Sequence, residues 1–136
     1  MKIEHIAIWV KDIEKVCEFY RKYFGGVVHP IYHNPTKQFT SRFVTFDDGA
    51  RLEVMHRPDI AVRIEYNVSH ETLSDIQHLG FTHLSFSVGS KEEVDRLTQQ
   101  MSSDGISVVG QPRTTGDGYY ESIVLDPEGN RIEITI

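Results

Sequence analysis

Four side chains in this sequence together suit a divalent metal ion. His5 and His83 are 78 positions apart, and Glu53 and Glu133 are 80 positions apart. Imidazole nitrogen binds zinc, nickel, cobalt and iron, and carboxylate oxygen completes the coordination shell of such ions. Carboxylates gathered in one place repel each other, so a cation is their natural partner. The alternative is that each of the four is a solvated strand residue.

The four residues follow an internal repeat of the sequence. IEHIAIWV, at 3–10, aligns with FTHLSFSV, at 81–88, and DDGARLEV, at 47–54, aligns with PEGNRIEI, at 127–134. Chance similarity of short motifs is the alternative to a duplication. We predict a single domain over 1–136, built of modules 1–57 and 79–136. The stretch 58–78 between them is interpreted as a linker, with a short helix near 70–77.

Each half is predicted to fold as βαβββ. Alternating strands at 2–10 and 81–89 are followed by helices, one ending at Gly25 and the other beginning after Ser90. Glycine tolerates the left-handed backbone of a helix end, and Ser90 with Glu93 matches a capping box. Hairpin turns are expected at 47–49 and 126–130. The remaining strands are expected at about 39–47, 51–56, 106–109, 119–125 and 131–136.

Alternation along these strands places the four polar residues on one face. In the first strand, His5 and Trp9 point away from the side taken by Ile6 and Ile8, and both glutamates likewise lie between apolar neighbours. The apolar face is expected to pack on the helices. A sheet that curves into a cup brings the polar face together around one ion. This predicts an α+β fold, with a curved, cup-shaped mixed sheet and helices on its outer face.

Composition narrows the class of protein. The chain has 136 residues and a net charge of -6, without a basic stripe, which argues against nucleic acid as a partner. No apolar run is long enough to span a membrane, and the first residues make a poor signal peptide, so a cytoplasmic location is expected. Cys17, the one cysteine, lies on the apolar stripe of the first predicted helix and is interpreted as a buried, inert thiol.

Aromatic residues near the predicted site are candidates for substrate contact. Trp9 shares the ligand face of its strand and either lines a pocket or fills the floor of the cup. Phe43 is expected to form a pocket wall. Tyr120 belongs to the glycine-flanked segment GDGYYE, at 116–121, which is either a rim loop or a simple hairpin connection.

The order His, Glu, His, Glu on paired βαβββ units resembles the glyoxalase/bleomycin resistance/extradiol dioxygenase superfamily, also called vicinal oxygen chelate. EHIAIWV, GDGYYES and DPEGNRIEI carry the resemblance, and the ligand set looks most like that of glyoxalase I, or lactoylglutathione lyase. It implies that His5, Glu53, His83 and Glu133 hold Ni2+ or Zn2+, with Co2+ as a further option. It also implies a small-molecule substrate and a homodimer. In short bacterial members of the superfamily the cup is often built from one module of each of two chains, so each metal site is completed either by one chain or by two.

The resemblance further implies a reaction. A hemithioacetal of methylglyoxal and a thiol becomes a lactoyl thioester by proton transfer through an ene-diolate. A metal ion stabilises the developing oxyanion, and a carboxylate moves the proton. Glu133 is the first candidate for this base and Glu53 the second.

The sequence differs from bacterial glyoxalase I enzymes at two positions that concern the binding of the thiol. Bacterial glyoxalase I enzymes generally place an arginine four residues after the first histidine ligand, where this chain has Trp9. The asparagine expected shortly after the first glutamate ligand is also absent. Arg57 or Arg42 could take over the binding of an anionic group. The thiol is therefore glutathione or another one.

Other activities in the superfamily remain alternatives. An epimerase uses the same deprotonation chemistry. An extradiol dioxygenase needs iron on two histidines and one carboxylate, and thiol transferases conferring antibiotic resistance use a similar set, so Glu53 counts against both. A metal-free protein that sequesters an antibiotic or another small molecule commonly lacks the ligand set altogether.

Overall fold

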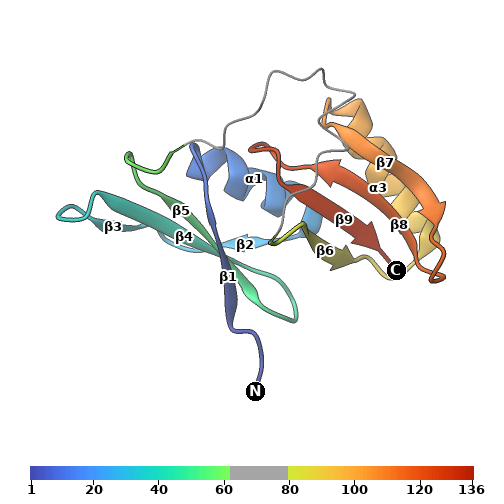
Figure 1. The fold of residues 1–136 in the computed structure, drawn as a ribbon, viewed down its shortest axis with the longest axis horizontal. Coiled ribbons are helices and arrows are strands. Elements are labelled where there is room, and N and C mark those ends of the chain that lie inside the picture. Colours follow the sequence, from blue (N-terminus) through green and yellow to red (C-terminus); the bar gives the residue numbers. More distant parts are fainter. Residues whose placement is uncertain (62–79) are drawn as a thin grey trace. The chain divides into compact units, whose positions relative to one another are not determined.

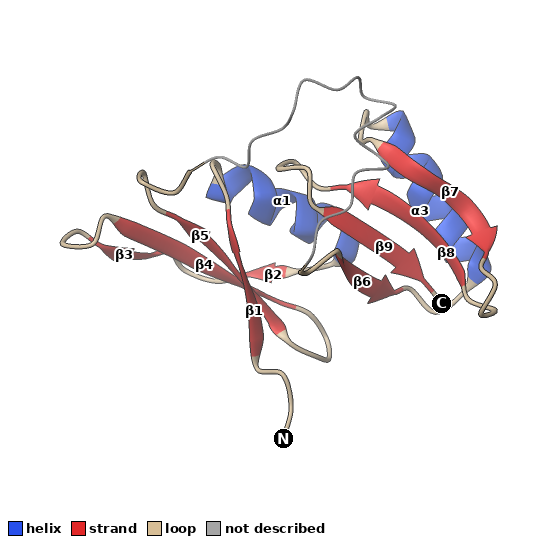
Figure 2. Cartoon of the chain, in the orientation of Figure 1, coloured by secondary structure: helices blue, strands red, loops and turns tan. Residues whose placement is uncertain are grey.

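The computed structural model describes residues 1–61 and 80–136, and the chain divides into two compact units, Met1–Ala61 and Val62–Ile136. Within the described residues, each unit combines one helix with one mixed sheet, which confirms the predicted α+β class (Figures 1 and 2). Most of the predicted linker 58–78, including its helix near 70–77, lies outside the described residues. None of the described helices has the length and apolar character needed to cross a membrane.

The first unit contains one helix and five strands: β1 (His5–Trp9), α1 (Ile13–Phe24), β2 (Val27–Val28), β3 (Tyr32–Asn34), β4 (Phe39–Thr45) and β5 (Arg51–His56). The sheet order is β1-β5-β4-β2, and β3 pairs with β4. The first strand runs parallel to β5, whereas the other pairs are antiparallel. The first and last strands of the unit, β1 and β5, are therefore neighbours in the sheet.

Local sequence explains where α1 begins and ends. Asp12 accepts a hydrogen bond from the Lys15 amide at 3.0 Å, and Gly25 ends the helix with a left-handed φ of 66°. The buried stripe of α1 packs on β4 and β5. Gly26 has no room for a side chain, because a Cβ there would lie 2.5 Å from Val44 Cγ1. This close approach seats the helix end on the sheet.

The second unit contains β6 (His83–Ser87), α3 (Lys91–Ser103), β7 (Val108–Thr114), β8 (Tyr120–Leu125) and β9 (Arg131–Thr135). Its sheet order is β6-β9-β8-β7, with β6 parallel to β9. Helix α3 lies along the face made by β7, β8 and β9 (Figure 1). The described part of this unit thus has the predicted βαβββ order, whereas the first unit has one more strand after its helix.

The capping of α3 differs in one respect from the expected reciprocal box. Ser90 Oγ accepts the Glu93 amide at 3.2 Å, as predicted. The Glu93 side chain, however, pairs with Arg96, one helical turn onward. The guanidinium offers the carboxylate two hydrogen bonds, which outcompete the single backbone amide at the cap.

A buried polar turn fixes the entry into β9. Asp126 Oδ1 accepts the amides of Glu128 and Asn130, both at 2.9 Å, and Asp126 Oδ2 accepts the Asn130 side-chain amide at 2.9 Å. Asp126 is only 4% exposed, so these bonds satisfy a carboxylate that would otherwise be costly to bury. The DPEGN sequence therefore sets the register of β9 and the position of Glu133.

The strand predictions are wrong in two places. Strands β2 and β3 were not expected. Strand β7 runs from Val108 to Thr114 instead of covering 106–109, although it contains Gly110 and Pro112. Both residues weaken a regular strand, but β7 is an edge strand with two register shifts, and such a strand accommodates them.

Candidate metal-binding site

The first histidine and the first glutamate meet on neighbouring strands. Parallel pairing of β1 with β5 sets His5 opposite Arg51 and Ala7 opposite Glu53. His5 Nε2 lies 3.9 Å from Glu53 Oε2, and the two side chains are 41% and 17% exposed. Leu52 and Val54, which flank Glu53, are buried on the opposite face of the sheet. Strand β5 therefore directs Glu53 to one face of the sheet and its two apolar neighbours to the other, as predicted.

The neighbours of His5 orient its ring. Glu4 forms a close hydrogen bond with His5 Nδ1 and a close ion pair with Arg51. The hydrogen bond with His5 lowers the pKa of the Glu4 carboxyl. Metal-binding histidines commonly give their second nitrogen to a carboxylate in this way, which directs Nε2 outward. Sequence reasoning gave Glu4 no role, although its position next to His5 was available as a signal.

The second pair is closer and has an additional donor. His83 Nε2 lies 3.5 Å from Glu133 Oε2. Ser85, opposite Glu133 in the β6–β9 register, donates from its hydroxyl to Glu133 Oε1 at 2.6 Å. Ala7 stands at the corresponding position of the first unit and has no hydroxyl. The two glutamates of the repeat therefore have different partners.

A third carboxylate borders the second pair. Glu121, on β8, contacts Glu133 and accepts a hydrogen bond from Arg113 Nη2 at 3.0 Å. Burial, and then the negative charge of Glu133, raise the pKa of the Glu121 carboxyl. Neither Glu121 nor Arg113 was singled out from the sequence, because the register of the last three strands decides which residues face Glu133.

The distances within each pair are slightly longer than those between neighbouring ligands of an ion that also leaves room for substrate. Two adjacent ligands about 2.1 Å from a six-coordinate metal lie about 3.0 Å apart. The 3.5 Å pair and the 3.9 Å pair would each reach this separation by rotation of the side chains. Within residues 1–61 and 80–136, no group of three or more His, Cys, Asp or Glu side chains gathers around one point. Each unit brings together one histidine and one glutamate of the predicted ligand set.

Three of the predicted substrate-binding residues lie near the first pair. Phe43 stands opposite Glu53, and its ring meets the His5 ring edge-on with centroids 5.7 Å apart. Trp9 is 42% exposed and meets Phe39 edge-on at 6.0 Å. The Arg57 guanidinium lies 5.6 Å from the centre of the Trp9 ring. Phe43 thus borders the first His–Glu pair, and Trp9, Phe39 and Arg57 form an aromatic and cationic cluster in the same unit.

The other two predicted substrate-binding residues point to the helices. Arg42 Nε bonds to Glu14 on α1 at 2.9 Å. The Tyr120 hydroxyl donates to Asp95 on α3 at 2.7 Å. Both side chains thus lie on the helix face of their sheets, opposite the face that carries the His–Glu pair. Strand alternation makes Glu121 the residue of that segment that faces Glu133.

Comparison with known proteins assigns the family. Residues 2–134 match the model of the Glyoxalase/Bleomycin resistance protein/Dioxygenase superfamily, which is nearly the whole chain. The chain belongs to this superfamily. Uncharacterized protein YqjT of Bacillus subtilis (strain 168), a similar sequence, is 23% identical over 135 residues, covering 97% of this chain and 96% of YqjT.

Solved structures in the glyoxalase superfamily share the fold. A glyoxalase family protein from Enterococcus faecalis has a TM-score of 0.74 and 24% identity, over 99% of this chain and 97% of its own. Glyoxalase I from Zea mays also has a TM-score of 0.74, at 17% identity. That match covers 98% of this chain but 44% of the Zea mays chain, so this protein spans less than half the length of that enzyme.

Proposed function

We propose that this protein is a metal-dependent lyase of the glyoxalase I kind, which converts a hemithioacetal of methylglyoxal into a lactoyl thioester. His5 with Glu53 and His83 with Glu133 together hold one divalent ion, Ni2+ or Zn2+. The observation that carries the proposal is the repetition of an imidazole–carboxylate pair at matching register positions of both units. Superfamily membership supports it.

The imidazole and the carboxylate of each pair are suitable ligands for a divalent metal ion. The bound ion would act as a Lewis acid toward the two neighbouring oxygens of the substrate. Glu4 holds the His5 ring, and Ser85 holds one oxygen of Glu133, so these residues keep the donor atoms in place.

Proton transfer is assigned to a carboxylate. In the proposed reaction Glu133 removes the proton from the carbon next to sulfur and returns it to the neighbouring carbon, and Glu53 is the second candidate. Both carboxylates are mostly buried, at 16% and 17% exposure, which limits competition by water for the transferred proton. A base of this kind contributes about 10²–10⁴-fold to the rate.

The thiol is not fixed by these residues. Trp9 occupies the place of the arginine that holds glutathione in similar bacterial enzymes. Arg57, stacked on the Trp9 ring, brings a positive charge back to the same surface. Glutathione and other thiols are therefore both substrates to be tested.

The test is a lyase assay with the metal supplied. The purified chain is stripped with a chelator, reloaded with nickel or zinc and given methylglyoxal with glutathione, and thioester formation is followed by ultraviolet absorbance. Glu133→Gln is expected to lower kcat by about 10²–10⁴-fold. Glu92→Gln, an exposed residue on α3, is the matched control and keeps full activity. Turnover equal in Glu133→Gln and wild type, at equal metal content, would remove Glu133 from its role.

Absence of turnover with every thiol, in the metal-loaded protein, would overturn the lyase proposal and leave an epimerase or dioxygenase to be examined. The assembly is proposed to be a homodimer, to be measured by light scattering of the same preparation. A mass equal to one chain would contradict the dimer without affecting the assignment of the ligands.

A metal-free binding protein is the second candidate. Trp9 and Tyr32 are 42% and 55% exposed, and both rings meet Phe39. Exposed aromatic side chains are suited to stacking on a flat ligand. Metal content separates the candidates: about one nickel or zinc ion per site supports the enzyme, and none after incubation with either ion supports the binding protein.

A further inference from the structure

Strand β7 is irregular at one point, and the irregularity changes which side chain faces the second His–Glu pair. Val108 lies opposite Val124, and Gly110 lies opposite Ile123, so two residues of β7 span one of β8. From Gly110 to Arg113, three residues of β7 span two of β8. Such bulges re-aim side chains and are common beside active sites.

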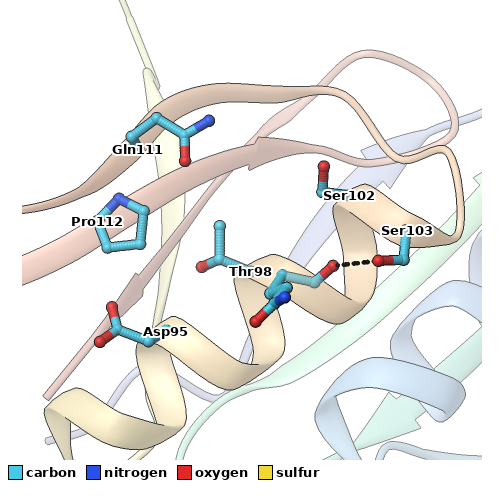
Figure 3. A pocket seen from close by; sticks show the side chains of 7 residues that line it. Asp95, Thr98, Ser102, Ser103, Gln111 and Pro112 are labelled. Carbon is cyan, nitrogen blue, oxygen red and sulfur yellow. Dashed lines mark hydrogen bonds between the residues drawn. The ribbon is translucent and has the colours of Figure 1, made fainter.

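Without these bulges, regular pairing from Val108 would set Gln111 opposite Glu121. With them, Arg113 takes that place. Gln111 and Pro112 instead lie over α3, where they help to line a groove of about 390 Å3 with helix residues such as Asp95 and Thr98 (Figure 3). The bulges thus separate two helix-facing residues from an arginine that faces the other side.

A glycine makes room for this arginine. A Cβ at Gly110 would lie 3.2 Å from Arg113 Nη1 and 3.2 Å from Ile123 Cβ. A side chain there would require the guanidinium or Ile123 to shift by a few tenths of an ångström. The backbone irregularity and the missing side chain therefore act together to leave room for Arg113 beside Glu121.

The guanidinium remains available to a ligand on its outer side. Arg113 donates from Nη2 to Glu121 and is 48% exposed, whereas Glu121 is 12% exposed. An arginine carries five N–H donors in a planar fork that matches a carboxylate. Glu121 holds one edge of this fork, and Glu121 in turn contacts Glu133. One carboxylate therefore separates the guanidinium from the predicted metal ligand.

We propose that Arg113, positioned by the β7 bulges, Gly110 and Glu121, binds a carboxylate of the substrate. The inference rests on the proposed function, because it names the class of molecule that this site takes. The substrate carries an acidic group a few bonds from the oxygens that reach the metal. A compact acidic thiol meets this description, and Arg113 then selects it over a neutral thiol of the same size.

The test uses two unreactive probes that differ in one group. 2-Hydroxyglutarate and its distal amide both present a hydroxyl next to a carboxylate for the metal, and only the first carries a second carboxylate. Each is titrated calorimetrically into the nickel-loaded full chain. Wild type is expected to bind the diacid about tenfold more tightly, which corresponds to about 1.4 kcal/mol. Arg113→Gln is expected to lose this preference.

Arg96→Gln is the matched control, because Arg96 also pairs with a glutamate in the same unit but lies on α3. It is expected to keep the tenfold preference. Gly110→Ala retains the arginine but displaces it, and is expected to reduce the preference. Circular dichroism of each variant checks the fold.

The outcomes separate this inference from the lyase proposal. Equal affinity of wild type for the two probes, or no binding of either, overturns the inference. A preference that survives Arg113→Gln also overturns it. Failure of the lyase assay beside a preference that depends on Arg113 overturns the reaction and leaves the carboxylate site standing.

Discussion

Ser85 makes the two glutamates of the repeat chemically different. Its hydroxyl donates to Glu133, whereas Ala7, its counterpart, offers nothing to Glu53. A bonded carboxylate loses rotational freedom, so Glu133 has one oxygen fixed and the other directed toward His83. We infer that the second pair is the better prepared of the two for a metal.

Ser85→Ala is expected to weaken nickel binding by about 10–100-fold, the usual effect of removing a group that orients a metal ligand. Competition with a chromophoric chelator measures the affinity. Ser87→Ala, two residues along the same face of β6, is the control and leaves the affinity unchanged. Equal affinities in wild type and Ser85→Ala would show that the hydroxyl does not prepare the site.

Cys17 is expected to be unreactive in the folded protein. It is 2% exposed, and burial raises the pKa of its thiol to about 11. A rise from 9.0 lowers the thiolate fraction at pH 8 by about a hundredfold, and the thiolate is the nucleophile. Iodoacetamide at pH 8, followed by mass spectrometry, should modify the chain only in denaturant. Rapid modification of the native protein would contradict this burial.

The sequence correctly predicted the direction of a side chain where the alternation of side chains along one strand is enough to determine it. His5 and Glu53, and likewise His83 and Glu133, were expected to share a face, and each pair does so. It was less successful with Tyr120 and Arg42, which face the helices. An aromatic or basic residue attracts attention by its type, but its direction depends on strand pairing, which the sequence does not state.

At the level of elements, short local signals define the helices. The Ser90 cap is the clearest in the second unit, since its hydroxyl satisfies an amide that has no partner within α3. Ser90→Ala is expected to lower the free energy of unfolding by about 1 kcal/mol. Urea unfolding followed by circular dichroism measures this loss.

Ser103→Ala is the control for that experiment. Its hydroxyl bonds back to the Gln99 carbonyl, four residues earlier in the same helix, a contact of little net value. An equal loss in the two variants would mean that the cap contributes no more than an ordinary helix serine.

Strand β7 shows why some elements escape prediction. Gly110 and Pro112 are strand breakers in a regular ladder, so the sequence predicts an early end to the strand. The chain instead keeps pairing by skipping residues, and places Arg113 opposite Glu121. Bulges depend on the partner strand, and a local pattern carries no information about that partner.

At the level of the whole molecule, each unit holds half of the proposed ligand set. A metal bound by both halves stabilises the folded chain, by about 2.7 kcal/mol at a hundredfold excess over Kd. Nickel is therefore expected to raise Tm by several degrees. Differential scanning calorimetry with and without the ion measures the shift.

Variants of the proposed ligands test whether the shift in Tm depends on both units. His5→Ala and His83→Ala are each expected to remove most of the shift, because the ion needs ligands from both units. His33→Ala, on β3 and outside the proposed ligand set, is the control and is expected to keep the shift. A full shift in one of the two ligand variants would show that a single unit binds the metal by itself.

The parallel pairing of first and last strands has a further consequence for how the protein is made. In each unit the histidine lies on the first described strand and the glutamate on the last, so the two can meet only after the whole segment between them has been synthesised. During synthesis the histidine leaves the ribosome long before its partner exists. Loss of the last strand removes the glutamate and the neighbour of the first strand together. The proposed metal site therefore requires the last strand of each unit, and a chain that lacks either strand lacks part of the site.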